Sequence, residues 1–257
     1  MKLEENLRKR KENKEILLMT HMVLGYPDFD TNREVIAQMV ENGVDSIELQ
    51  IPFSEPVADG PVILKASQDS IDGGTKVIEC INFAKEMVEK WDIPFLFMTY
   101  YNIVFKYGEE AFFKKCAEIG ITGVIVPDIP PEMGGSFYKF AEQYGISPVL
   151  IFAPTSSDER MELTGKCSRG FVYCVPRKGV TGAKSEFGEG LTQYLARCRK
   201  HTSLPLGVGF GIQNRANVEA LIGKADIAII GSKTIKLVDE KGAAAVGPFI
   251  RHLLGEE

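Results

Sequence analysis

One unit recurs along this chain: an amphipathic helix, a glycine, and then a strand rich in β-branched residues. The first such helix carries Val35, Ile36 and Met39 on one face, ends at Gly43 and is followed at once by a strand. Glycine fits the left-handed position that ends a helix, and the short connection returns each strand parallel to the last. Strands are expected at residues 16–23, 45–51, 94–99, 122–126, 147–152, 170–175, 204–208 and 227–230.

Eight alternating units in about 250 residues predict an α/β fold, a (β/α)8 TIM barrel. An open doubly wound sheet would show the same local pattern and is the alternative. Because no linker or shift in composition divides the chain, we expect residues 1–257 to form a single (β/α)8 barrel domain. An extra N-terminal helix at residues 3–10 precedes the first strand, and we expect it to close the bottom of the barrel.

The composition argues against several classes of protein. A net charge of −5 at pH 7 is unlike a nucleic-acid binder, which normally carries a basic excess. No segment approaches the roughly 20 apolar residues of a membrane span, and the apolar run near the N-terminus lacks a signal-peptide cleavage site. The five cysteines are odd in number and lack the spacing of a metal site, which indicates reduced thiols in a cytoplasmic protein.

The segment IELQIPFSEPVADGPVI, residues 47–63, holds the best candidates for catalysis. Because alternate strand residues face opposite ways, Glu48 and Gln50 point into the barrel if their apolar neighbours pack on helices. A carboxyl group there is desolvated, which raises its pKa and lets it keep a proton near neutral pH. Asp59 lies on the following loop and is expected to be exposed and ionised. Two carboxyl groups with such different environments form a plausible acid–base pair.

Glycine-rich segments follow the sixth, seventh and eighth predicted strands, where barrel enzymes often hold phosphate. Glycines let backbone N–H groups approach an anion, and the helix N-terminus that follows adds a favourable dipole. Ser232 offers a further hydrogen bond. Turn glycines explain any one of these segments, but the three together predict a phosphate site. They are KGVTGA at residues 178–183, GFG at 209–211 and GS at 231–232.

Several candidate residues also have structural explanations. Glu48 could pair with a lysine or arginine inside the barrel, and Asp59 could cap its loop. Tyr100 and Tyr173 could be packing residues, and His21, on the first strand, could be a satisfied core histidine. No Ser/His/Asp triad and no metal-ligand spacing can be argued from the sequence.

Together the motifs resemble those of the tryptophan synthase α subunit family over nearly the whole chain. The resemblance implies a barrel enzyme that cleaves indole-3-glycerol phosphate into indole and glyceraldehyde 3-phosphate, a retro-aldol reaction without a cofactor or metal. The long motif after the second strand is the most specific one. The motifs are LGYPD at residues 24–28, IPFSEPVADGPVI at 51–63, VPDIP at 126–130, GVTGA at 179–183, GFGI at 209–212 and IGS at 230–232.

The resemblance also implies roles for individual residues. Glu48 would protonate the indole carbon and help to move the glycerol hydroxyl proton. Asp59 would bond the indole N–H and stabilise positive charge on the ring. Thr181 would lie on a loop that closes over the substrate and meets Asp59. The other substrate-binding residues would be Ile63, Tyr100, Tyr173 and Phe210 around the indole, and Gly182, Gly211, Gly231 and Ser232 around the phosphate.

By the same resemblance, the partner is a pyridoxal-phosphate-dependent tryptophan synthase β subunit in a heterotetramer of two α and two β chains. The loops at residues 52–61, 102–107 and 130–134 would form the interface. A stand-alone lyase that releases indole, and an activator of a β subunit with reduced catalysis, are the alternatives. Four residues depart from the family pattern: Gln50 replaces glycine, Glu55 aspartate, Pro176 serine, and His21 an aromatic ring.

Overall fold

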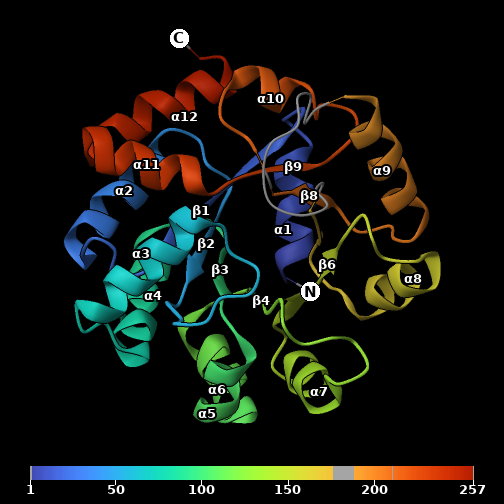
Figure 1. Ribbon diagram of the computed structural model, residues 1–257, viewed down its shortest axis with the longest axis horizontal. Helices are drawn as coiled ribbons and strands as arrows, with labels where there is room; N and C mark the ends of the chain where they lie inside the picture. The colour runs from blue at the N-terminus through green and yellow to red at the C-terminus, as the bar shows by residue number, and fades with distance from the viewer. Residues whose placement is uncertain (1, 176–187, 210, 257) are drawn as a thin grey trace.

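The computed structural model describes residues 2–175, 188–209 and 211–256. At its centre a parallel sheet closes into a barrel surrounded by helices (Figure 1). The order of pairing is β5-β4-β3-β2-β1-β9-β8-β7-β6. The strands are β1 (Leu17–Val23), β2 (Ser46–Gln50), β3 (Phe95–Met98), β4 (Gly123–Ile125), β5 (Ser147–Val149), β6 (Ile151–Phe152), β7 (Val172–Cys174), β8 (Leu206–Val208) and β9 (Ile227–Ile230).

The two ends of this sheet, β5 and β6, are separated in the chain by Leu150 alone. They are therefore halves of one strand, the predicted strand at 147–152, and the sheet closes through it. The interruption has a local cause, because the N–H of Leu150 donates to Ser168 Oγ at 3.1 Å. The predicted (β/α)8 barrel is confirmed, and the open doubly wound sheet is wrong.

The helices form the outer layer, and a first apolar core lies between them and the strands. Ile47 and Leu49 of β2 belong to this outer core, which leaves Glu48 and Gln50 on the inner face as predicted. The helices after the first one, α1 (Lys2–Lys11), are α2 (Phe29–Glu41), α3 (Pro61–Asp72), α4 (Val77–Lys90), α5 (Tyr101–Tyr107), α6 (Glu109–Ile119), α7 (Gly135–Gln143), α8 (Asp158–Cys167), α9 (Glu189–Lys200), α10 (Arg215–Glu219), α11 (Ser232–Lys241) and α12 (Val246–Leu254), with the 3-10 turn η1 (Ala243–Ala245).

The predicted N-terminal helix is α1 (Lys2–Lys11), and it closes one end of the barrel. Its Leu3 and Leu7 are buried in a second apolar core, inside the barrel. The fit is close, since a methyl group added to Gly170 would come within 2.5 Å of Leu3 Cδ2. This inner core fills one half of the barrel and leaves the other end open for a site.

None of the helices in the described part of the chain has the length and apolar character needed to cross a bilayer.

Candidate active site

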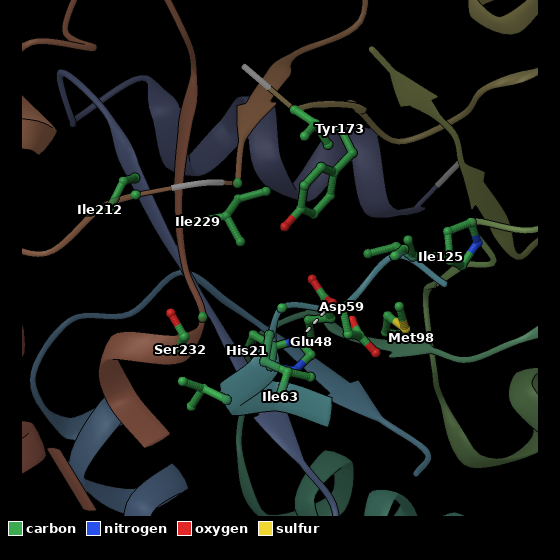
Figure 2. A pocket seen from close by; sticks show the side chains of 18 of the residues that line it. His21, Glu48, Asp59, Ile63, Met98, Ile125, Tyr173, Ile212, Ile229 and Ser232 are labelled. Atoms are coloured by element: carbon green, nitrogen blue, oxygen red, sulfur yellow. Dashed lines mark hydrogen bonds and ion pairs between the residues drawn. The ribbon is translucent and has the colours of Figure 1, made fainter. Parts of the chain in front are cut away.

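A cavity of about 410 Å³ lies at the carboxyl ends of the strands (Figure 2). Its apolar lining comes from strands on both sides of the barrel and from the start of α3. Polar side chains from different elements also line it, among them His21, Glu48, Asp59 and Tyr173. The apolar lining includes Ile63, Met98, Ile125, Ile151, Ile212 and Ile229.

Glu48 is 3% exposed on the inner face of β2, and it lines this cavity as predicted. It pairs in register with His21 on β1, and His21 Nδ1 lies 2.8 Å from Glu48 Oε1. The carboxylate partner is therefore a histidine rather than the lysine or arginine considered from the sequence. The second oxygen, Oε2, is buried and has no hydrogen-bond partner among the described residues.

His21 is only 5% exposed, and its ring both lines the cavity and has its hydrogen-bonding partner in Glu48. Burial by itself would lower the pKa of His21. The charge of Glu48, the hydrogen bond to it and the charge of Asp59 outweigh burial and raise the pKa of His21 above 6.5. The contact between His21 and Glu48 could not be predicted from the sequence, because it depends on the register of β1 against β2.

Asp59 lies on the loop between β2 and α3 and faces the same cavity as Glu48 (Figure 2). Its Oδ2 accepts hydrogen bonds from Gln50 Nε2 at 2.8 Å and from the Tyr100 hydroxyl at 3.1 Å. Burial raises the pKa of Asp59, while the charge of His21 and these two hydrogen bonds oppose that rise. The expected exposure of Asp59 is wrong, because the loop folds back and half-buries the carboxyl group, while its ionisation stays a prediction.

Tyr100 was predicted to form part of the apolar slot, but it is not among the described residues that line the cavity. Its ring is fully buried and stacks on Phe53 with 5.0 Å between centroids. Its hydroxyl accepts from the N–H of Ala58 at 3.1 Å and donates to Asp59. Tyr100 therefore positions the loop after β2 and the Asp59 carboxylate through hydrogen bonds, and does not line the cavity.

The structure describes part of the predicted phosphate site. Gly211, Gly231 and Ser232 line the cavity, and Ser232 opens the ten-residue helix α11, whose N-terminus carries a partial positive charge. Lys236 also lines the cavity and was missed from the sequence. Its spacing of four residues from Ser232 was the available signal, since such residues share a helix face.

Three predicted substrate contacts, Thr181, Gly182 and Phe210, lie outside the described residues, as does Pro176. The described residues contain no group of three or more histidine, cysteine, aspartate or glutamate side chains that could hold a metal ion. Ile63 and Tyr173 do line the cavity, and their contact with substrate stays a prediction.

The arrangement suits an elongated ligand. Two carboxyl groups and a histidine flank an apolar slot, and a helix N-terminus with a lysine stands at its edge. Such a site can donate and accept protons at the apolar part of a ligand and bind an anion at the other part. Fold and site together define a (β/α)8-barrel enzyme.

Comparison with known proteins makes the assignment specific. A family model described as "Tryptophan synthase alpha chain" matches residues 7–248. The chain belongs to the tryptophan synthase alpha chain family, a family of lyases, and acts as an alpha chain in tryptophan biosynthesis. The family recognised from the motifs is thereby confirmed.

Curated relatives and solved structures agree with this assignment. The tryptophan synthase alpha chain of Desulfotalea psychrophila is 62% identical over 253 residues, which cover 98% of this chain and 100% of that one. That of Desulforapulum autotrophicum is 55% identical over 98% and 99% of the two chains. A chain of Mycobacterium tuberculosis tryptophan synthase superposes with a TM-score of 0.91 at 30% identity, over 99% and 97%. A chain of the Pyrococcus furiosus α2β2 complex gives a TM-score of 0.87 at 30% identity, over 93% and 98%.

Proposed function

We propose that this chain cleaves indole-3-glycerol phosphate into indole and glyceraldehyde 3-phosphate, and that indole passes to a β subunit. The observation that carries the proposal is that Glu48 and Asp59 face one largely apolar cavity, at whose edge Ser232 and Lys236 provide groups for an anion. A flat aromatic ring joined to a short phosphorylated chain has the matching distribution of apolar and charged parts.

The proton transfers balance if Glu48 acts first as an acid and then as a base. Glu48 first gives its proton to the indole carbon that bears the glycerol chain, which makes the ring cationic. Asp59 bonds the indole N–H and stabilises this charge. The Glu48 carboxylate then accepts the proton of the glycerol hydroxyl as the carbon–carbon bond breaks and its electron pair returns to the ring. Indole and an aldehyde leave, and Glu48 is again protonated.

The remaining contacts are proposed on the same basis. Ile63 and Tyr173 line the apolar part of the cavity and would hold the indole ring. Backbone N–H groups at the start of α11, the Ser232 hydroxyl and the Lys236 ammonium would hold the phosphate. Glycines 211 and 231 would let the anion approach the backbone, and Thr181, Gly182 and Phe210 complete the proposed set by resemblance alone.

The proposed partner is a pyridoxal-phosphate-dependent β subunit, in a heterotetramer of two α and two β chains. Residues 102–107, expected as a loop, belong instead to helix α5. Each of the three segments named from the sequence exposes a large apolar side chain. Val57 is 80% exposed, Phe105 66% and Met133 77%. Large exposed apolar side chains on three neighbouring connections are typical of a surface that a partner covers. One relative in structure is described as part of an α2β2 complex.

We further propose that residues 1–257 act as one domain in the cytoplasm. Strands from the beginning and the end of the chain, β1 and β9, pair with each other, so no part of the barrel is complete alone. All five cysteines are free thiols, as expected in a reducing compartment.

Indole release from indole-3-glycerol phosphate, measured with and without a β subunit, tests the proposed function. We expect the chain alone to form indole and the β subunit to raise the rate. Equal rates with and without the β subunit would instead identify a stand-alone lyase. An absence of indole in both assays would contradict the proposed catalysis and favour an activator that has lost it.

A further inference from the structure

We propose that His21 is a positioning residue for this reaction: it holds Oε1 of Glu48 and shares one proton with the carboxyl group, which fixes the orientation of that side chain in the cavity. The proposal rests on the proposed function of Glu48. It concerns a position at which the resemblance leads us to expect an aromatic ring and at which this chain has an imidazole.

The geometry gives the two oxygens of Glu48 different environments. Oε1 lies 2.8 Å from His21 Nδ1, so a proton on Nδ1 donates to it. Oε2 is buried, has no partner among the described residues and belongs to a side chain that lines the cavity. A carboxyl group held at one oxygen keeps one orientation relative to a bound ligand.

The pair can hold its extra proton in two places. On Oε2 the proton makes Glu48 an acid beside a neutral imidazole. On His21 Nε2, which is also buried and unpartnered among the described residues, it makes an ion pair. When Glu48 gives its proton to the substrate, the new anion keeps the bond from Nδ1, which offsets the cost of a buried carboxylate.

The surroundings contain few other charges that could replace His21. Asp59 faces the pair from the loop before α3, and Tyr173 faces it from β7. Lys236 of α11 lines the same cavity, while β9 contributes the apolar Ile229. Within the described lining, His21 is the basic group in direct contact with Glu48.

Two variants of His21 distinguish its role in orienting Glu48 from its role in sharing a proton with Glu48. His21→Asn keeps an N–H donor close to the place of Nδ1 but cannot take the extra proton. His21→Phe keeps a ring but removes both the N–H donor to Glu48 and the second site for the proton. We expect His21→Phe to lower kcat for indole release about ten- to a hundredfold, as for a lost hydrogen bond to a charged group, with KM within about threefold.

His21→Asn should keep kcat at its pH optimum within about threefold of the parent. The alkaline limb of its pH profile should move at least about half a unit to lower pH, because the pair loses one of its two proton sites. His252→Asn, at an exposed helix position, is the control and should leave both quantities unchanged. A parental kcat for His21→Phe, or a parental alkaline limb for His21→Asn, would overturn the proposal.

Nuclear magnetic resonance of the imidazole groups gives a readout that needs no turnover. The chain has three histidines, and His21→Asn assigns the His21 signal. We expect the His21 pKa to lie above 6.5 in the parent and to fall in Glu48→Gln; equal values would contradict the pairing. The two proposals fail separately. Parental activity of Glu48→Gln would overturn the proposed function, whereas an inactive Glu48→Gln with unaffected His21 variants would overturn this inference alone.

Discussion

Each carboxyl group in the cavity has its own neutral or basic partner from an inner-facing strand position. His21 on β1 contacts Glu48, and Gln50 on β2 contacts Asp59. A buried carboxylate without such partners is strongly disfavoured, and donors fix the direction in which it points.

Gln50→Ala tests whether the amide positions Asp59. The variant removes the donor at 2.8 Å and leaves the bond from Tyr100 at 3.1 Å. We expect kcat for indole release to fall about tenfold, because Asp59 then samples orientations that do not face the indole N–H. Gln68→Ala, whose amide donates to the exposed Asp72 on α3, is the control. A parental kcat for Gln50→Ala would show that Tyr100 alone positions the carboxylate.

At the scale of single elements, two helices have distinct tasks at opposite ends of the barrel. Helix α1 fills the closed end through Leu3 and Leu7, and α11 begins at the cavity with Ser232. One contributes mainly to stability, and the other to ligand binding. This division follows the usual polarity of such barrels, in which the carboxyl ends of the strands carry function.

Leu3→Ala should destabilise the fold. Leu3 is fully buried and packs against Gly123 and Gly170, so its truncation leaves a cavity that the barrel cannot easily fill. We expect the free energy of unfolding to fall by about 2–5 kcal/mol in urea titrations. The same change at Leu163, which is 38% exposed on α8, should cost less than about 1.5 kcal/mol. Equal losses would argue against α1 as part of the barrel core.

Lys236→Met tests the anion end of the site. Removal of the ammonium group should raise KM about two- to fivefold and leave kcat nearly unchanged, since the charge acts on bound and reacting substrate alike. The difference from the parent should shrink as salt is added. Lys233→Met is the matched control, because Lys233 lies on the same helix but is not among the cavity-lining residues. A larger KM effect at Lys233 would place the phosphate elsewhere.

For the whole molecule, the open end of the barrel joins the site to the proposed partner surface. Asp59 lies two residues from Val57, which is 80% exposed, so one loop carries both a proposed catalytic group and a proposed contact. Contacts on that loop can therefore alter the position of Asp59, which gives a physical route for a partner to change the rate.

Phe105→Ala tests the partner surface. Phe105 is 66% exposed at the end of α5, and we expect its truncation to weaken binding of a β subunit about fivefold or more, measured by calorimetry. Indole release by the variant alone should stay parental. Ile78→Ala, at a residue that is 51% exposed on α4 and outside the three segments, is the control. Unchanged affinity for Phe105→Ala would exclude this part of the surface.

The parts of the account that could be predicted from the sequence depend on local periodicity. Alternation along β2 put Glu48 inside the barrel, and the helix–glycine–strand unit gave the strands. The burial of Asp59 and the place of Tyr100 depend on how the loop after β2 folds back, which no local pattern encodes. The contact of His21 with Glu48 likewise depends on the register between β1 and β2, which the sequence does not show.

Glu48→Gln gives the most direct test of the central claim that Glu48 is the acid of this site. The change removes the ionisable group at nearly constant volume. We expect indole release to fall at least about a hundredfold, with an unchanged circular dichroism spectrum. Glu89→Gln, an exposed position on α4, should keep the parental rate. A near-parental rate of indole release by Glu48→Gln would contradict the account.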